Sequence, residues 1–445
     1  MNIFIAGGGR VGFHLARLLS AENHDVTVIE SDRSVLEHID YSLDVSTIAG
    51  NALDVILLKS SGVGEADLFL AATGEDQTNL IVATTAKGLG AKQVVARVHN
   101  PIFIESDILY ETIMGIDYII SPQALTALEI AGYIENPGLV ATESFARGLV
   151  KMRQIRAARV PLAPGQTLKD ISLPDGVLIG AISRNGTVEI PHGDSTLQEH
   201  DLVTLLGCKD SVAEAQKLFQ RSETKNRSIS IMGGSSVGIH LAQILEKKKE
   251  LTVKLFDRNL DRCHELAAIL ERTKVVCRDA ALRLSLEQEH IDDADIFVGA
   301  TGDDERNIMA AVLAKEVGVK ETVAVVHQPD FAPLVAKLGI DHAVTPRACV
   351  ANRILKLVNQ GQASSLAIIE EGQIDILEYN IRASNPIIGS RLSDIKFPRD
   401  SLIASILRGE DVIIPKGPDV IQAGDTVIVI ATDKSVDSVR KMFDL

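Results

Sequence analysis

The chain has 445 residues, of which 46% are hydrophobic, and it carries a formal net charge of −15. This length corresponds to about three or four domains of roughly 100–200 residues each. The negative charge, and the lack of a basic block interleaved with aromatic residues, argue against nucleic-acid binding. No run of about 18 apolar residues occurs, so we expect no membrane-spanning helix.

The first residues lack the basic stretch and long apolar core of a secretory leader, which predicts a cytoplasmic protein. None of the four cysteines forms a C-x-x-C pair, so we expect reduced thiols rather than a disulfide framework. We interpret these cysteines as small, buried, apolar residues, namely Cys208, Cys263, Cys277 and Cys349.

Residues 1–135 alternate short β-branched bursts with segments of helical periodicity. The first burst is Asn2–Ala6, a helix is expected over Val11–Leu19, and the next burst is Val26–Ile29. Apolar strands separated by helices are typical of a parallel sheet buried on both faces. We therefore predict an α/β fold with a Rossmann-like, doubly wound parallel sheet.

The first strand runs into Gly7-Gly8-Gly9-Arg10-Val11-Gly12, a G-x-G-x-x-G sequence that opens a helix. Gly7 permits the tight turn, Gly9 lets the backbone approach a phosphate, and Gly12 lets the helix pack on the strand. The helix N-terminus offers N–H groups and a positive dipole end to phosphates. Glu30 ends the second strand, where a carboxylate can bind ribose hydroxyls and would repel the 2′-phosphate of NADP.

Ligands of such sheets bind at the carboxyl ends of the strands. The loops Gly50-Asn51-Ala52 and Ala72-Thr73-Gly74 follow the third and fourth bursts, so both should line the base and ribose. The guanidinium groups of Arg10 and Arg97 suit phosphate oxygens, with a surface salt bridge as the alternative for each. The candidate nucleotide-binding residues of this first cleft are Gly7, Gly9, Arg10, Val11, Gly12, Glu30, Asn51, Ala52, Thr73, Gly74 and Arg97.

A different pattern follows over residues 146–222. Short alternating stretches are separated by turn residues such as Pro164-Gly165 and Asn185-Gly186, and a helix is expected over Ser211–Phe219. Alternation with tight turns is typical of hairpins, so we predict a small α+β domain. The polar stretch Gln220–Arg227 is interpreted as a linker.

The whole arrangement then occurs a second time. The segment Ala66–Gly74 recurs as Ala294–Gly302, and Leu168–Ile171 recurs as Leu392–Ile395. The matches keep their order along nearly the full chain, which indicates a tandem duplication. The predicted domains are Rossmann-like at 1–135 and 227–360, and small α+β at 146–222 and 365–445.

The second copy of the glycine motif is altered. It reads Gly233-Gly234-Ser235-Ser236-Val237-Gly238, so Ser235 and Ser236 replace the glycine of close approach and the loop arginine. Val325 replaces the strand arginine, whereas Asp257 still ends the second strand. Because both arginines are lost, we expect a phosphate chain to prefer the first cleft, and the second to bind a less charged nucleotide or none. The candidate binding residues of the second cleft are Asp257 and Thr301.

No catalytic constellation is apparent, since H-E-x-x-H, C-x-x-C, G-x-S-x-G and P-loop lysine motifs are all absent. His99 and His327 recur beside a proline, and we interpret them as structural, with catalysis as the alternative. The runs Glu75-Asp76 and Asp303-Asp304 are interpreted as solvated helix starts, with cation binding as the alternative. Paired ligand-binding domains without catalytic groups favour a sensor, so no catalytic residue and no metal site are predicted.

The glycine motif, the Ala72-Thr73-Gly74 loop, the elements Ser121-Pro122 and Thr345-Pro346, and the duplicated domain order resemble the RCK/KTN family of potassium-transport regulators. The resemblance covers the whole chain. It implies binding of ATP, ADP or NAD(H) and a homotetrameric ring of eight modules. It also implies a membrane-embedded potassium transporter subunit of the Trk type as partner, so that the ring lies at the inner face of the plasma membrane.

In this family, ligand-dependent changes of ring shape bias the ion pathway, and basic residues in the glycine loop and fifth strand contact phosphate, which fits Arg10 and Arg97. Some relatives carry an acidic residue after the S-P pair in a cation or inter-subunit site. Here Gln123 and Arg347 stand at that position, so the resemblance implies no bound cation there. Two alternatives stay open, a nucleotide-sensing regulator of another cation transporter or antiporter and an NAD-dependent oxidoreductase.

Overall fold

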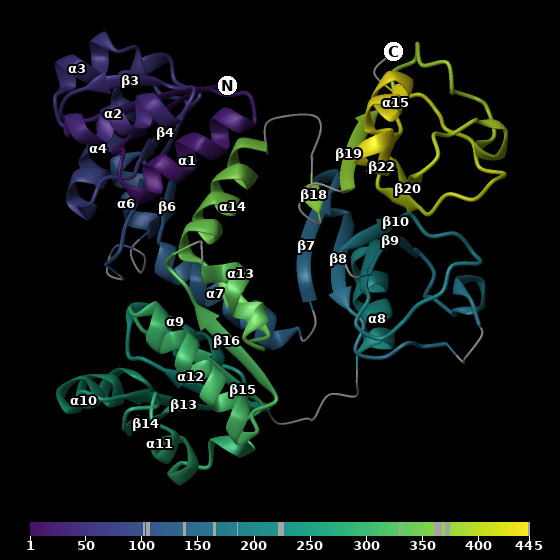
Figure 1. Ribbon diagram of the computed structural model, residues 1–445. Helices are drawn as coiled ribbons and strands as arrows, with labels where there is room; N and C mark the ends of the chain where they lie inside the picture. The colour runs from purple at the N-terminus through teal and green to yellow at the C-terminus, as the bar shows by residue number, and fades with distance from the viewer. Residues whose placement is uncertain are drawn as a thin grey trace. The chain divides into compact units, whose positions relative to one another are not determined.

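The computed structural model describes residues 1–100, 103, 107–136, 139–162, 166–184, 186–220, 227–328, 331–359, 367–369 and 374–443. The chain forms two compact units (Figure 1). The first unit combines Met1–Ile134 with Lys225–Val358, and the second combines Glu135–Thr224 with Asn359–Leu445. Within the described ranges, no helix is long and apolar enough to cross a bilayer.

The first half of unit one is a six-stranded parallel sheet in the order β3-β2-β1-β4-β5-β6, which confirms the predicted doubly wound fold. Its central strands are fully buried because helices cover both faces. The strands are β1 (Asn2–Ala6), β2 (Asp25–Glu30), β3 (Ser46–Ala49), β4 (Leu68–Ala71), β5 (Gln93–Arg97) and β6 (Tyr118–Ile120). The helices are α1 (Arg10–Ala21), α2 (Arg33–Ser42), α3 (Val55–Ser60), α4 (Asp76–Leu89), α6 (Asp107–Met114) and α7 (Pro122–Glu135).

The second half of unit one repeats this topology in the order β14-β13-β12-β15-β16-β17, as the duplication predicts. The strands are β12 (Arg227–Met232), β13 (Leu251–Asp257), β14 (Lys274–Cys277), β15 (Ile296–Gly299), β16 (Glu321–Val325) and β17 (His342–Val344). The helices are α9 (Ser236–Leu245), α10 (Leu260–Ile269), α11 (Arg283–Gln288), α12 (Asp304–Val317), α13 (Ala332–Lys337) and α14 (Pro346–Asn359). Arg227, assigned to the linker from its polarity, instead begins β12.

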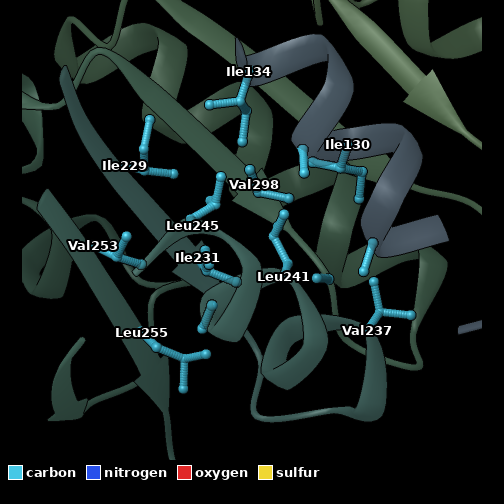
Figure 2. Close-up of a cluster of buried hydrophobic side chains, with 14 of the residues drawn as sticks. Ile130, Ile134, Ile229, Ile231, Val237, Leu241, Leu245, Val253, Leu255 and Val298 are labelled. Atoms are coloured by element: carbon cyan, nitrogen blue, oxygen red, sulfur yellow. The ribbon is translucent and has the colours of Figure 1, made fainter. Parts of the chain in front are cut away.

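The two halves of unit one exchange their last helices. Figure 2 shows Ile130 and Ile134 of α7, from the first half, packed among Val237 and Leu241 of α9 and the strands of the second sheet. Conversely, Ile354 of α14 lies in the core built on β1, β2 and α1. Each core is therefore completed by a helix of the other half, so neither half buries its apolar surface alone.

Unit two contains two antiparallel sheets with matching strand orders, β10-β9-β11-β8-β7 and β21-β20-β22-β19-β18. The first small domain has β7 (Leu139–Phe145), β8 (Val150–Arg156), β9 (Val177–Arg184), β10 (Thr187–Glu189), β11 (Leu202–Cys208) and α8 (Lys209–Phe219). The second has β18 (Ala367–Ile369), β19 (Ile374–Asn380), β20 (Ser401–Arg408), β21 (Asp411–Ile413), β22 (Thr426–Thr432) and α15 (Asp433–Phe443). Short 3-10 helices lie at Val63–Glu65, Ala146–Gly148, Leu168–Asp170, Ile291–Asp293 and Leu392–Asp394. The predicted α+β character is confirmed.

Asn185 of the predicted Asn185-Gly186 turn lies outside the described residues, but β9 and β10 on either side pair antiparallel and Gly186 has φ +78°. The turn predicted at Pro164-Gly165 lies outside the described residues. The repeated aspartates Asp201 and Asp425 are buried, and each binds an arginine through both carboxylate oxygens at 2.7–3.0 Å. The domain boundaries themselves stay a prediction.

The cysteine prediction is wrong in part. Cys263 is buried, but Cys208 and Cys349 are only half-buried and Cys277 is exposed. Cys277 is the last residue of β14, an edge strand whose alternate side chains face outward, so alternation along the strand overrides the apolar preference of the thiol.

We predict that Ile130→Ala lowers the free energy of unfolding of unit one by about 2–5 kcal/mol, because this fully buried side chain would leave a cavity in the core of the opposite half. Urea unfolding followed by circular dichroism measures the change. Leu128→Ala on the same helix is the matched control, since Leu128 is 56% exposed and should change stability by no more than about 0.5 kcal/mol. Equal costs for the two variants would contradict the exchange of α7.

Candidate functional site

A cavity of unit one lies at the carboxyl ends of β1, β2, β4 and β5 and has a volume of about 750 Å³. That volume is in the range of small-molecule sites, roughly 300–1,000 Å³. The cavity brings together ten of the eleven predicted residues of the first cleft, namely Gly7, Gly9, Arg10, Val11, Glu30, Asn51, Ala52, Thr73, Gly74 and Arg97. Gly12 does not line this cavity. It lies behind the glycine loop, where α1 approaches the carbonyl of Gly7.

The glycine loop has the backbone geometry that its sequence predicts. Gly7 has φ +100°, and a Cβ there would lie 2.9 Å from the backbone of Thr73. A Cβ on Gly12 would lie 1.8 Å from the carbonyl oxygen of Gly7, so α1 can approach the loop only because that atom is missing. Gly9 is the N-cap residue of α1, and among the described residues no side chain accepts a hydrogen bond from the first-turn N–H groups. Gly9, Arg10 and Val11 line the cavity, so this end of the helix borders it.

Glu30 holds the loop from the side of β2. Its Oε2 accepts from the N–H of Gly8 at 2.7 Å, and its Oε1 accepts from the N–H groups of Ser31 and Asp32 at 2.6 and 2.9 Å. Partial burial raises the pKa of Glu30, but these hydrogen bonds outweigh it and the net pKa lies below the usual value. The carboxylate is thus ionised at neutral pH, and it positions the loop as well as lining the cavity.

A buried asparagine holds the loop after β4. Asn79 Oδ1 accepts from the N–H and the hydroxyl of Thr73 at 2.8 and 2.7 Å, and Nδ2 donates to the carbonyls of Thr73 and Arg97 at 3.1 and 2.8 Å. Asn307 makes the same four contacts in the second half, at 2.6–3.0 Å. No local motif points to this asparagine, and its role follows from the tertiary structure.

Arg97 lines the cavity beside a histidine–aspartate pair. Asp76 accepts from the N–H groups of His99 and Asn100 at 2.8–3.0 Å, and His99 Nδ1 lies 3.0 Å from the same carboxylate. Since an ionised carboxylate only accepts, Nδ1 is the donor, and Nε2 faces the guanidinium of Arg97. The Nε of Arg97 is buried without a hydrogen-bond partner in the described part of the chain.

The expectation of a solvated helix start is wrong for these aspartates. Asp76 is 11% exposed and Asp304 is 6% exposed, and each ties the start of its helix to the loop after the neighbouring strand. Hydrogen bonds from that loop hold the pKa of Asp304 below its usual value, although burial acts in the opposite direction. Among the described residues, no cluster of three or more side chains is arranged to hold a metal ion.

Residues of the second half also line the first cavity, which the sequence did not predict. They are Val237, His327, Pro346 and Arg347. They reach it because the two halves pack against each other through α7 and α14, at a sequence separation of more than 200 residues. Local motifs carry no signal for such a contact, although Arg347 was noted as a departure from the family pattern.

A second cavity, of about 400 Å³, occupies the equivalent position in the second half and includes Asp257 and Thr301, as predicted. Its loop differs from the first at the helix start. Ser235 Oγ accepts from the N–H of Gly238 at 3.2 Å and donates to the carbonyl of Ala300 at 2.5 Å. The serine hydroxyl thus accepts a hydrogen bond from a first-turn N–H group. Without the serine, that N–H group would be available to a phosphate.

The second cleft lacks the counterparts of Arg10 and Arg97, as its sequence shows, but it contains arginines at other positions. Arg258, Arg278 and Arg306 line it, at positions where the first copy has Ser31, Gly50 and Thr78. Two are neutralised by neighbours, because Arg306 lies 2.6 Å from Asp279 and Arg278 lies 3.0 Å from Glu289. These arginines lie outside the glycine loop and the fifth strand, where the motif predicts phosphate-binding residues.

Two open parallel sheets, each with a glycine-rich turn after its first strand and an acid at the end of its second, define a protein with two dinucleotide-binding-type domains, each followed by a small antiparallel domain. The TrkA-N domain model matches residues 3–122 and 229–346, and the TrkA-C domain model matches residues 160–220 and 376–444. The chain therefore belongs to the family of TrkA-N and TrkA-C domain proteins, as the RCK/KTN resemblance predicted.

Relatives of known name match over the full length. The chain is 34% identical to the Trk system potassium uptake protein TrkA homolog 2 of Methanosarcina mazei and 35% identical to the TrkA homolog of Archaeoglobus fulgidus, with all of both chains covered. Two solved structures, the GsuK RCK domain and the GsuK channel bound to NAD, match all of this chain and 95% and 79% of theirs. Both have a TM-score of 0.63 at 19% identity, which bears on the fold alone.

We predict that Asn79→Ala destabilises unit one by about 1–3 kcal/mol, because buried groups of Thr73 and Arg97 lose their partners. Thermal and urea unfolding measure this cost. Asn307→Ala removes the same four contacts from the second half and should have a similar cost. A large cost for only one of the two variants would show that the asparagine is not a common brace of both loops.

Proposed function

We propose that this chain is a nucleotide-binding regulatory subunit of a Trk-type potassium uptake system. The observation that carries the proposal is the open first cleft, in which uncapped N–H groups of α1 face a cavity lined by Arg10, Arg97 and Glu30. Family membership supplies the physiological setting, since the full-length relatives are named as potassium uptake proteins.

The ligand of the first cleft is an adenine nucleotide, ATP, ADP or NAD(H). Helix N–H groups and guanidinium forks bind phosphate oxygens, and an acid at the end of β2 suits a ribose without a 2′-phosphate. The buried Nε of Arg97, without a partner among the described residues, would gain one from an anion. The NAD-bound GsuK channel offers a precedent on the same fold.

The first cavity is lined by residues of both halves of unit one, which suits a regulatory role. A ligand that contacts both halves stabilises one arrangement of them over others, by as much as its affinity differs between arrangements. Assembled as a homotetrameric ring in the cytoplasm, such units would pass that change to a membrane-embedded potassium transporter subunit. We assign no chemical reaction and no catalytic residue to the chain.

The second cleft is proposed to be the weaker phosphate site. Its helix start is capped by Ser235, and two of its three arginines are held by carboxylates. The difference between the clefts thus lies in a hydrogen-bond acceptor at the loop as much as in net charge.

Gly9→Ser tests the proposal by giving the first loop the residue of the second. Gly9 has an extended backbone, with φ −63° and ψ −172°, and a Cβ there would have no atom within 4 Å, so serine fits without strain. We expect stability to change by only a few tenths of a kcal/mol. ATP affinity should fall about tenfold or more in calorimetric titration, since a hydrogen bond to a charged group is worth about 1.5–3 kcal/mol.

Ser235→Gly is the control for this substitution. It removes the cap of the second loop and should leave the affinity of the first cleft unchanged. Unaltered ATP binding by Gly9→Ser would contradict the assignment of the α1 N-terminus as the phosphate site. Oxidation of NADH at enzymatic rates with a small-molecule acceptor would contradict the regulatory role.

A further inference from the structure

We propose that Arg347, at the start of α14 in the second half, binds the terminal phosphate of a nucleoside triphosphate held in the first cleft. The inference rests on the proposed function, since it takes the first cleft as a nucleotide site. It adds to that site a residue from the other half of the chain. It also predicts that the site binds a nucleoside triphosphate more tightly than a diphosphate.

The guanidinium of Arg347 lies at the first cavity and binds no other described residue. Arg347 lines the first cavity together with Pro346, and its side chain is only partly exposed. In the described part of the chain the guanidinium of Arg347 forms no hydrogen bond and no ion pair. It is close enough to α1 for its charge to contribute to lowering the pKa of His14, after burial and Arg17. His14 lies one helical turn beyond Arg10, so both arginines approach the same end of α1.

Among the described residues around the cavity, Arg10 and Arg347 are the arginines whose guanidinium forms no hydrogen bond and no ion pair. Arg97 lies beside the Asp76–His99 pair, and the negative charge of Asp76 partly compensates the positive charge of Arg97. Of the cavity carboxylates, Glu30 is engaged by backbone N–H groups and Glu75 accepts from the hydroxyl of Thr78. An entering polyphosphate would thus meet two guanidinium groups that have no partner among the described residues, one from each half of unit one.

The order of the sheet gives the direction in which the phosphate chain runs. The ribose acceptor Glu30 ends β2, the glycine loop follows β1, and Thr73 follows β4, next in the sheet. Further along the same edge come Arg97 of β5 and the start of α7 after β6, beside which the residues of the second half enter. With the nucleoside at β2, each additional phosphate lies closer to that end of the cavity. The last phosphate of a triphosphate would be the one that reaches Arg347.

The duplication is asymmetric at this position. Gln123 occupies the place in α7 that Arg347 occupies in α14, and it does not line the second cavity. The first cleft therefore receives a guanidinium from the opposite half, whereas the second receives none. Arg10 of the first half and Arg347 of the second half thus both line the first cleft.

Arg347→Gln tests the proposal, since it installs the residue found at the equivalent position of the first half. Calorimetric titration of the full chain with ATP, ADP and NADH should show ATP affinity reduced about 10- to 100-fold. ADP and NADH affinities should change less than about threefold. Arg347→Lys should restore ATP binding in part, because it keeps the charge but not the fork. Arg353→Gln, an exposed arginine on the same helix outside the cavity, is the control and should leave all affinities unchanged.

Several outcomes overturn the proposal. Equal weakening of ATP and ADP would place Arg347 at an inner phosphate, and unaltered ATP binding would remove it from the site. Thermal unfolding of each variant without ligand separates a lost contact from a lost fold. If wild-type protein binds none of the three nucleotides, the proposed function fails together with this inference, whereas wild-type binding with an indifferent Arg347→Gln variant refutes the inference alone.

Discussion

The uncapped N-terminus of α1 is the feature on which the first cleft depends. The N–H groups of a first helical turn have no partner within the helix, and in the described part of the chain no side chain accepts from those of α1. The surrounding residues keep this end open and in place. Gly7 and Gly12 allow the loop to lie against β4 and α1, while Glu30 holds the N–H of Gly8. In the second half a single hydroxyl, that of Ser235, supplies the missing acceptor.

The exchange of α7 and α14 connects this site to the rest of unit one. Because each helix completes the core of the opposite half, the two halves form one compact body, and the first cavity gains a wall that its own half does not supply. A nucleotide in that cavity would contact parts of the chain that are far apart in sequence. A ligand bound in the first cleft can then influence both halves directly, because it contacts both of them.

Much of the fold followed from the sequence because its signals are local. Strand bursts, helical periodicity and the G-x-G-x-x-G turn act within a few residues, and the repeat made the second half predictable from the first. Ten of the eleven residues expected in the first cleft line one cavity, because they all follow strands of a parallel sheet. The bracing role of Asn79 and the pairing of Asp76 with His99 depend on contacts between separate elements, so the sequence alone could not assign them.

Other features escaped prediction for physical reasons. The contact of Arg347 with the first cavity depends on packing between the two halves, which no local pattern encodes. The arginines that line the second cleft stand at positions where the first copy has no charged residue, so the first copy gives no signal for them. Exposed Cys277 shows that strand alternation outweighs residue type at an edge strand.

The proposed difference between two clefts of equivalent fold can be measured by calorimetric titration of the purified chain with ATP, with the stoichiometry counted per chain. We expect a single strong site per chain, with any second binding event much weaker. Two sites of equal affinity, or a strong site that persists when the first loop is blocked by substitution, would contradict it.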